Sequence, residues 1–420
     1  PGVPKMKINK KTPSLPVGFL DFRGNTLELK KNIIKIIEDN FINFGFSALE
    51  QSIFEKSENI GSFLADDSNN PMADVYTFKD GKEQLTYRYD MTAGLARMYA
   101  ANYRELPSIY KRYCIGDVAR RDKPQKNIRL KSFTQADCDI IGNVDKYQAN
   151  AELCNLIADT LLKLNFKEDQ FQICISNRKI IEGLINDLKI KDEKQKLSVF
   201  RAIDKISNPN IGISGVKDLL GSKRADQSGA IQIGANLSKD QIETIINCIQ
   251  LKDLKEISSS LKNPLSKEGI NETEKLLEIV SYGNYSNQIN ISIEKVRGIN
   301  YYSGWLVETE LSIPNFGSGL SVCSGGEYRD LIGSFKGRST PGVGISFGIT
   351  RLTAILSEIK QLKVNEKKPA LICVMDSKYL SKYYEILNEL RSNGINSEIY
   401  LDSEKNLGKQ LTYANVRGCP

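Results

Sequence analysis

The segment from Tyr87 to Gly142 constrains the fold of this chain more than any other part, because it reads as strands joined by a charged loop. Arg120, Arg121 and Asp122 lie at the end of one expected strand, and a run that starts at Phe133 forms the next. Side chains two residues apart on a strand project to the same face of a sheet. The segment therefore predicts an antiparallel hairpin with one polar face.

The polar face of this hairpin has the composition of a binding site. On the run from Phe133 to Asp139, Gln135 and Asp139 share one face, at a rise of about 3.3 Å per residue. Arg120 and Asp122 have the same relation on the preceding strand. A cationic fork at one end and acceptors at the other suit a zwitterion and a phosphate. A solvated hairpin tip explains any one of these charges, but several charges at matched positions favour a site.

The chain contains no histidine, which excludes a Ser-His-Asp triad, a Cys-His pair and histidine metal ligands. Its eight cysteines include no C-x-x-C pair, so we expect reduced thiols in a cytoplasmic protein and no protein-bound metal. No apolar run is long enough to span a bilayer, and we expect neither a secretory signal nor a membrane partner. The formal net charge of +7 is compatible with a nucleic-acid partner.

Local patterns predict the elements around the hairpin. Helical spacing of apolar residues predicts a helix over residues 25–46, with Asn25 and Glu28 as a capping pair. A second helix is expected from Asp145 to Phe166, with its first residue as the N-cap, and a third over residues 271–281. Strands are expected at the segment that closes with Arg88, Asp90 and Thr92, over residues 171–176, and on both sides of a helix over residues 377–393.

The central segment resembles the class II aminoacyl-tRNA synthetases, and specifically the histidyl-tRNA synthetases. Motif 2 of that class has an Arg, an acid two residues later, a loop with another Arg, and a return strand. Arg120, Asp122, Arg129 and the strand from Phe133 match this order. The helix over residues 25–46 resembles part of motif 1, which builds the dimer interface. The sequences RYDMTAGLAR and TQADCDIIG resemble the two histidine-binding strands of the family.

Two later segments extend the resemblance. RGINYY resembles the histidine-specific signature of the family, which implies that Arg297 lies beside the α-phosphate and that Tyr301 and Tyr302 contact or shape the imidazole slot. A glycine-rich segment resembles motif 3, in which Arg351 sandwiches adenine and reaches the γ-phosphate. Gly348 lies just before that Arg, where a glycine lets a nucleotide approach the backbone.

These matches assign a role to each candidate residue. Asp90 and Gln135 are expected to hold the substrate α-amino group with Thr92 beside them, and Asp139 is expected to hold the imidazole. The complete set is as follows: catalytic, Arg120 and Arg297; amino-acid-binding, Asp90, Met91, Thr92, Gln135, Asp139, Tyr301 and Tyr302; ATP-binding, Arg120, Asp122, Arg129, Gly348 and Arg351.

The expected fold class is α+β, with a class II antiparallel sheet flanked by helices, a helical insertion and a partial α/β anticodon-binding domain. The segments VFRAIDKIS and KDLLGSKRADQSGA resemble the insertion of the alphaproteobacterial branch. We expect short helices and little sheet in that insertion. The predicted boundaries are 1–186 for the first part of the catalytic domain, 187–265 for the insertion, 266–358 for the second catalytic part, 359–368 for a linker and 369–420 for the partial anticodon-binding domain.

The resemblance implies a histidine–tRNA ligase that works as a homodimer. Such an enzyme activates L-histidine with ATP to histidyl-adenylate and pyrophosphate, then transfers histidine to the 3′ end of tRNA(His). Mg²⁺ bound through the β- and γ-phosphates of ATP is implied. Two alternatives stay open: a catalytically silent, histidine-sensing regulatory subunit of ATP phosphoribosyltransferase, and a general nucleic-acid-binding protein.

Overall fold

The computed structural model describes residues 13–60, 75–121, 124, 128–208, 211–225, 231–296, 302–314, 316–328, 332–333, 335, 339–362, 368–402 and 406–420. The chain divides into two compact units, Pro1–Leu362 and Lys363–Pro420. Among the described residues, no helix combines the length and the apolar composition needed to cross a membrane.

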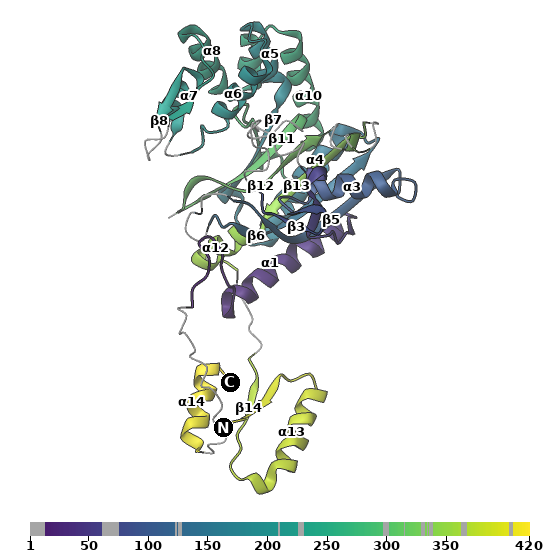
Figure 1. Ribbon diagram of the computed structural model, residues 1–420, viewed down its shortest axis with the longest axis vertical. Coiled ribbons are helices and arrows are strands. Elements are labelled where there is room, and N and C mark those ends of the chain that lie inside the picture. Colours follow the sequence, from purple (N-terminus) through teal and green to yellow (C-terminus); the bar gives the residue numbers. More distant parts are fainter. Residues whose placement is uncertain are drawn as a thin grey trace. The chain divides into compact units, whose positions relative to one another are not determined.

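A mixed sheet forms the centre of the first unit and confirms the predicted α+β class (Figure 1). Its inner neighbours all pair antiparallel, whereas the outermost strand at each edge pairs parallel. The strand order across the sheet is β1 (Ser47–Ala48), β5 (Ile109–Ala119), β6 (Ser132–Gly142), β13 (Gly342–Gly348), β12 (Gly317–Tyr328), β11 (Tyr302–Ile313), β7 (Phe171–Asn177) and β10 (Ile289–Ile291).

The predicted hairpin is the β5–β6 pair, which keeps one register from Ile109 opposite Gly142 to Ala119 opposite Ser132. Strand alternation separates the two faces of this sheet. On β13, Phe347 packs against Phe41 with ring centroids 6.2 Å apart, whereas the neighbouring Ser346 lines the cavities described below. The sheet therefore has one face covered by helices and one polar face that is free to form a site.

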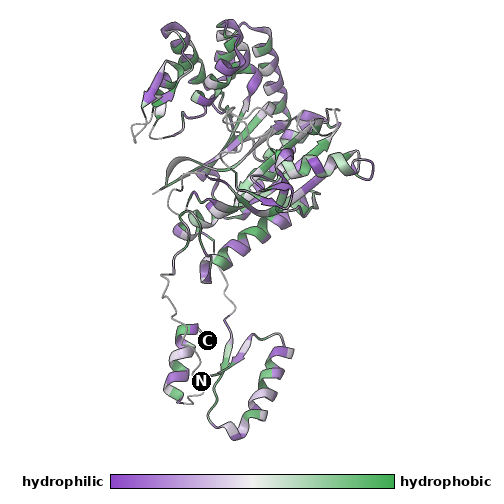
Figure 2. Ribbon diagram, viewed as in Figure 1, coloured by the Kyte–Doolittle hydropathy of each residue, from purple (hydrophilic) through white to green (hydrophobic). Residues whose placement is uncertain are grey.

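Three helices cover the first face: α1 (Gly24–Asn43), which packs against both of the others, α4 (Lys146–Lys163) and α12 (Ile349–Ile359). Hydrophobic and hydrophilic residues alternate along α1 in Figure 2, as expected for a helix with one buried side. A buried hydrogen bond of 2.8 Å from Asn40 Nδ2 to Thr160 Oγ1 joins α1 to α4. The helices thus hold the strands in place from behind the polar face.

The structure confirms one predicted helix cap and contradicts another. Asp145 caps α4, because its side chain accepts two backbone N–H groups at 2.9 Å each. The predicted capping pair of Asn25 and Glu28 is wrong: the N-cap of α1 is Arg23, whose side chain makes no capping bond. Glu28 instead pairs with Lys31 one turn later. A helix with strong packing partners forms without a side-chain cap.

The expected strand that closes at Thr92 is also wrong. The strand β4 (Glu83–Tyr87) ends earlier, and Thr92 is the first residue of α3 (Thr92–Asn102). The side chain of Asp90 accepts the backbone N–H of Ala93 at 3.0 Å, which supports the start of this helix. β4 pairs with β2 (Phe54–Lys56) and β3 (Thr77–Asp80) in a separate sheet beside α2 (Ser57–Ile60).

A second buried cluster occupies the region around the predicted insertion. Ile185, Phe200, Leu220 and Ile245 are among its buried members. Its helices are α5 (Arg178–Asp187), α6 (Glu193–Ile203), α7 (Gly212–Leu220), α8 (Lys239–Ile249), α9 (Leu254–Ser260) and α10 (Pro264–Val280). Contrary to expectation, α10 begins well before residue 271, because Pro264 suits a first helical position and Asn263 caps it. The short antiparallel ribbon of β8 (Lys223–Ala225) and β9 (Ile231–Ile233) was not predicted.

The second unit, Lys363–Pro420, has the β-α-β order that the sequence predicts. β14 (Ala370–Ile372) and β15 (Ser397–Ile399) pair in parallel, and α13 (Leu380–Ser392) connects them. The last helix, α14 (Leu407–Arg417), contributes Gln410, whose buried side-chain amide bonds both the N–H and the carbonyl of Val374 at 2.8 Å. This amide ties the helix to the end of the first strand.

Replacing the α4 cap tests how much this local signal contributes to stability. We expect Asp145→Ala to lower the free energy of unfolding by about 1 kcal/mol, because two backbone donors lose their acceptor. Arg23→Ala is the matched control at an uncapped N-cap, and should change stability by less than about 0.5 kcal/mol. Urea unfolding followed by circular dichroism measures both, and equal effects of the two changes would contradict the assignment.

Candidate active site

Two adjoining cavities open on the polar face of the central sheet. The larger has a volume of about 320 Å³, within the usual range for small-molecule sites. The smaller has about 30 Å³ and lies against the middle of β6, β12 and β13. Ser324 and Ser346 line both cavities, so the two form one continuous site.

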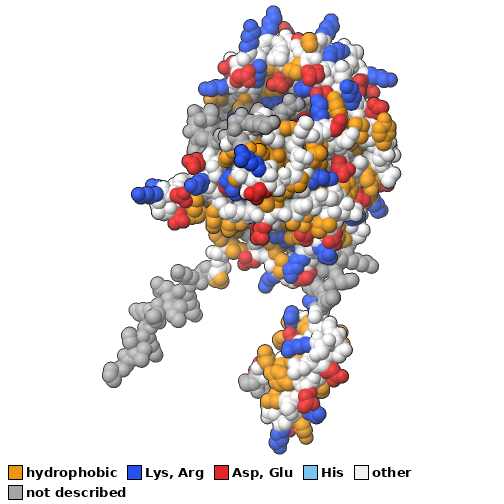
Figure 3. Space-filling model, turned by 90° about the vertical axis from the view of Figure 1, so that its right-hand side faces the viewer, with side chains coloured by type: hydrophobic (Ala, Val, Ile, Leu, Met, Phe, Trp, Pro, Cys, Tyr) orange, Lys and Arg blue, Asp and Glu red, His pale blue; other side chains and the backbone are white. Residues whose placement is uncertain are grey.

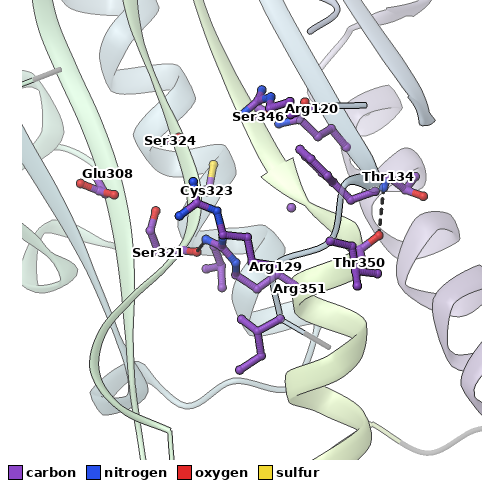
Figure 4. Close-up of a pocket in the computed structure, with 16 residues that line it drawn as sticks. Arg120, Arg129, Thr134, Glu308, Ser321, Cys323, Ser324, Ser346, Thr350 and Arg351 are labelled. Carbon is purple, nitrogen blue, oxygen red and sulfur yellow. Dashed lines mark hydrogen bonds between the residues drawn. The ribbon is translucent and has the colours of Figure 1, made fainter. Parts of the chain in front are cut away.

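Three predicted arginines line the larger cavity: Arg120 after β5, Arg129 in the following loop and Arg351 on α12. Figure 4 shows the Arg129 and Arg351 side chains extending toward Ser321, and Arg120 in another part of the view. Three guanidinium groups from separate elements make this cavity suitable for a polyanion, since each can bind phosphate oxygens through parallel N–H groups.

The surroundings of Arg120 fix its guanidinium group. Its Nε donates to the carbonyl of Tyr89 at 3.1 Å. The guanidinium carbon lies 4.3 Å from the centroid of the Tyr89 ring and 5.2 Å from that of the Phe133 ring. An arginine held between aromatic rings loses little further freedom when it binds an anion.

The beginning of α12 supplies a second feature for anion binding. Gly348 occupies the N-cap position, and both Gly348 and Thr350 line the larger cavity. The hydroxyl of Thr350 accepts the backbone N–H of Thr134 at 2.9 Å, drawn as a dashed line in Figure 4, which joins the helix start to β6. The positive end of the helix dipole thus faces the same space as the arginines.

Glu308 on β11 also lines the larger cavity, together with the hydroxyl-bearing Ser321 and Ser324. Its carboxylate lies 3.9 Å from the ammonium group of Lys295, which is buried. Sequence reasoning missed Glu308, although it lies on the strand that follows the predicted histidine signature. Strand alternation along that segment is the signal that could have identified it.

A buried ion pair forms the floor of the smaller cavity. Asp139 Oδ2 lies 2.7 Å from Arg112 Nη2, and the Tyr328 hydroxyl donates to Asp139 Oδ1 at 2.8 Å. Arg112 is fully buried, and neither it nor Tyr328 was predicted. Burial raises the pKa of Asp139, while the charge of Arg112 and the Tyr328 bond oppose that rise. Gly344 is required beside this pair, because a Cβ there would lie 2.0 Å from Asp139 Oδ1.

Asp137 projects into the smaller cavity and was not assigned a role from the sequence. Only 4 % of it is exposed, and its Oδ1 has no hydrogen-bond partner among the described residues. Burial raises the pKa of this carboxyl to about 7, while Arg112 and the Ser346 hydroxyl oppose the rise. Strand alternation predicted that Gln135 and Asp139 share one face of β6. The same rule places Asp137, which lies two residues from each, on that face.

The remaining candidates are distributed over the two cavities and their walls. Gln135 lines the larger cavity, whereas Thr92, Asp139 and Tyr302 line the smaller one. Asp90 lies at the start of α3, close enough to Asp137 and Asp139 to raise the pKa of both. Met91 is fully buried in the core beside Cys114 and Val118, and lines neither cavity. Asp122, Arg297 and Tyr301 lie outside the described residues.

The site therefore separates charge along its length. Arginines and a helix N-terminus surround the larger cavity, and carboxylates line the smaller one. Such an arrangement suits a ligand with a cationic group at one end and a polyanion at the other, with reacting atoms between them. Because no histidine is present, the site must act by positioning and by charge, with no imidazole base.

Comparisons with known proteins agree with this geometry. A family model described as Histidyl-tRNA synthetase matches residues 18–352. The chain is 57% identical to the histidine–tRNA ligase of Pelagibacter ubique, covering 99% of this chain and 90% of that protein. It is 34% identical to the same ligase of Ruegeria pomeroyi, covering 98% and 87%. The crystal structure of histidyl-tRNA synthetase from Nostoc sp. PCC 7120 is similar, with a TM-score of 0.75 and 26% identity over 97% of this chain and 90% of that one.

The buried ion pair yields a prediction about stability. Arg112→Met leaves Asp139 buried without its cation, so we expect a loss of roughly 3–5 kcal/mol in the free energy of unfolding. Adding Asp139→Asn to that variant should recover part of the loss, because no unpaired charge remains. The control is Arg104→Met, an exposed arginine whose loss should cost less than about 0.5 kcal/mol. Similar costs for Arg112→Met and Arg104→Met in urea unfolding would refute the pair's importance.

Proposed function

The chain belongs to the histidyl-tRNA synthetase family, and from this premise we propose how its two cavities divide the work of a histidine–tRNA ligase. The protein is such a ligase, with histidine, ATP and tRNA(His) as its substrates. It joins histidine to ATP as histidyl-adenylate, releases pyrophosphate, and passes the histidine to the 3′ end of the tRNA. The alternative of a regulatory subunit is less supported, because the relatives that match this chain over nearly its whole length are ligases.

One observation carries the proposed arrangement: an arginine-lined cavity opens directly into a carboxylate-lined one, with Ser324 and Ser346 at the junction. ATP occupies the larger cavity, and histidine lies at the junction with its side chain directed toward the smaller one, whose volume of about 30 Å³ takes only part of an amino acid. The histidine carboxylate then lies at the junction, next to the α-phosphate. A carboxylate is already ionised at neutral pH, so it can attack phosphorus without a general base. This explains how the chemistry proceeds in a protein with no histidine.

The amino acid is recognised in the smaller cavity and at its junction with the larger one, by residues of β6 and of the start of α3. The side-chain oxygens of Asp90 and Gln135 accept hydrogen bonds from the α-ammonium group, with Thr92 beside them. The Asp139 carboxylate accepts a hydrogen bond from an imidazole N–H, and the ion pair with Arg112 fixes the orientation of this carboxylate. Tyr302 lines the same cavity, and Tyr301 next to it in sequence completes the imidazole slot. Met91 supports this wall from the core, where its carbonyl accepts a 3.4 Å bond from the same guanidinium group.

The larger cavity binds the nucleotide. Arg120 and Arg297 converge on the α-phosphate, and Arg351 on the distal phosphates. Arg129 and Asp122 also contribute to ATP binding, and Gly348 leaves room for the nucleotide against the backbone. Charge that develops on the α-phosphorus and on the departing pyrophosphate is stabilised by these guanidinium groups, of which that of Arg120 is held in place by its neighbours. Preorganised charges of this kind lower the barrier because they need no reorganisation during reaction.

The larger cavity also fits Mg²⁺ bound mainly through ATP. Mg²⁺ prefers oxygen ligands and commonly binds one or two carboxylates together with substrate phosphates. Glu308 supplies a carboxylate on this cavity, and the described residues contain no cluster of three or more acidic, cysteine or histidine side chains. Glu308, together with the phosphates of ATP, would therefore hold the ion, and the ion would help to neutralise charge on the leaving pyrophosphate.

The tRNA requires a larger surface than either cavity. Phosphate contacts supply much of the affinity of proteins for nucleic acids, and the net charge of +7 favours them. Figure 3 shows lysine and arginine side chains interspersed with acidic ones on the displayed face. The second unit resembles the start of an anticodon-binding domain and would read unstacked bases. The motif 1 resemblance of α1 supports a homodimer with one catalytic site in each subunit.

Exchange of labelled pyrophosphate into ATP tests the proposed function. We expect exchange when L-histidine is present and no exchange above background when it is omitted or replaced by another amino acid. The reason is that pyrophosphate returns to ATP only through histidyl-adenylate. Charging of tRNA(His) should follow from the same preparation. Histidine binding without any exchange would favour the regulatory-subunit alternative.

Arg297 provides a test of the proposed transition-state role. Arg297→Lys should slow adenylate formation by roughly 10- to 100-fold while weakening ATP binding far less, because lysine keeps the charge but loses the planar fork. Single-turnover measurement of adenylate formation over a range of ATP concentrations separates the two effects. Weaker ATP binding with an unchanged chemical step would assign Arg297 to ground-state binding only.

A further inference from the structure

We infer that Asp137 is a third acceptor for the α-ammonium group of histidine, completing the site formed by Asp90 and Gln135. The inference rests on the proposed function and extends it, because Asp137 had no role in the arrangement above. Its carboxylate lies between the residue assigned to the amino group and the residue assigned to the imidazole, on the same face of β6.

Two residues next to Ser346 each have a buried side-chain oxygen without a hydrogen-bond partner among the described residues. These oxygens are Asp137 Oδ1 and Gln135 Oε1. Gln135 Nε2 donates to Ser346 Oγ at 2.8 Å, and Asp137 lies directly opposite Ser346 in the β6–β13 register. A buried acceptor without a donor costs free energy, commonly about 1–3 kcal/mol. A ligand that brings donors to this point removes that cost.

The number and charge of the missing donors point to an ammonium group. A primary ammonium has three N–H donors and no acceptor. Two of these donors would meet the unpaired oxygens of Gln135 and Asp137, and the third would meet the Asp90 carboxylate proposed for the same group. Aliphatic or hydroxyl groups supply too few donors to satisfy them. Backbone N–H groups are not available for this purpose, because β6 and β13 pair with each other along this stretch.

The charge balance of the smaller cavity also calls for a cation. Its described lining residues include Asp137 and Asp139 but no lysine or arginine. Arg112, behind the lining, is paired with Asp139, and Tyr328 donates to the same carboxylate. Asp90 at the start of α3 adds negative charge near Asp137 and Asp139, while Ser346 and Tyr302 are uncharged lining residues on β13 and β11. A bound ammonium supplies the charge that Asp137 lacks.

Asp137 is better placed for the amino group than for the imidazole. Asp137 lies nearer the junction of the cavities than Asp139 does. Its partner across the β6–β13 pair is Ser346, which lines both cavities, whereas the partner of Asp139 is Gly344, which lines only the smaller one. The substrate carboxylate must reach the junction to meet ATP. The ammonium is bonded to the carbon next to that carboxylate, so it falls beside Asp137, and the ring extends toward Asp139.

The test compares two ligands in Asp137→Asn and in the unchanged protein. L-histidine carries the ammonium group, whereas 3-(imidazol-4-yl)propanoate keeps the ring and carboxylate and lacks the amine. We expect the variant to raise the KM for histidine in pyrophosphate exchange by roughly 10- to 100-fold, the range for a hydrogen bond to a charged group. The inhibition constant of the desamino compound should change less than about twofold.

Asp139→Asn is the matched control on the same strand face. It should weaken the binding of both ligands, because the Asp139 side chain is proposed to contact the imidazole ring that both contain. Thermal unfolding reports whether each variant is folded, and Asp137→Ser carries the same comparison if the Asn variant does not fold. Equal weakening of both ligands by Asp137→Asn, or no weakening of either, overturns the inference. Failure of the unchanged protein to exchange pyrophosphate with histidine would instead refute the proposed function, so the two failures are distinguishable.

Discussion

The fully buried pair of Arg112 and Asp139 is the interaction on which the site depends. It connects β5 to β6, and the Tyr328 hydroxyl extends the connection to β12. β13, which lies between β6 and β12, leaves room for the carboxylate because Gly344 has no side chain. The Asp139 carboxylate thus connects three strands, and the fourth passes directly beside it. Because an unpaired buried charge is so costly, alternatives that separate these strands are strongly disfavoured.

This network also explains why the two cavities differ in charge. The charge of Arg112 is paired with Asp139 inside the sheet. The carboxylates near the smaller cavity therefore outnumber the cations there. The arginines of the larger cavity come from loops and from the start of α12, beyond the ends of the central strands. This separation of charge is the basis for the proposed orientation of the zwitterionic amino acid between them. In that proposed arrangement, the substrate carboxylate meets the α-phosphate without a proton-transfer residue.

Much of this site was predictable because strand alternation is a local rule. The positions of Gln135 and Asp139 follow from it, and so does the β5–β6 pairing. The same rule covers Asp137, but a strand face alone does not distinguish a carboxylate with a partner from one without. Arg112 was missed because its charge is paired across strands, and its own sequence neighbourhood reads as an ordinary strand. The error at Thr92 arose because a short polar segment fits both a strand end and a helix start.

The sequence by itself determined most of the local elements, the motif order and the family, since these depend on residue types at short separations. It also excluded histidine-based chemistry outright. Only the tertiary structure decided which side chains meet: Asp139 with Arg112, Gln135 with Ser346, and Thr134 with Thr350. In two of these pairs, Gln135 with Ser346 and Thr134 with Thr350, the partners lie more than 200 positions apart in the chain. Pairing across β6 and β13 brings them together, and no local pattern encodes contacts at that separation.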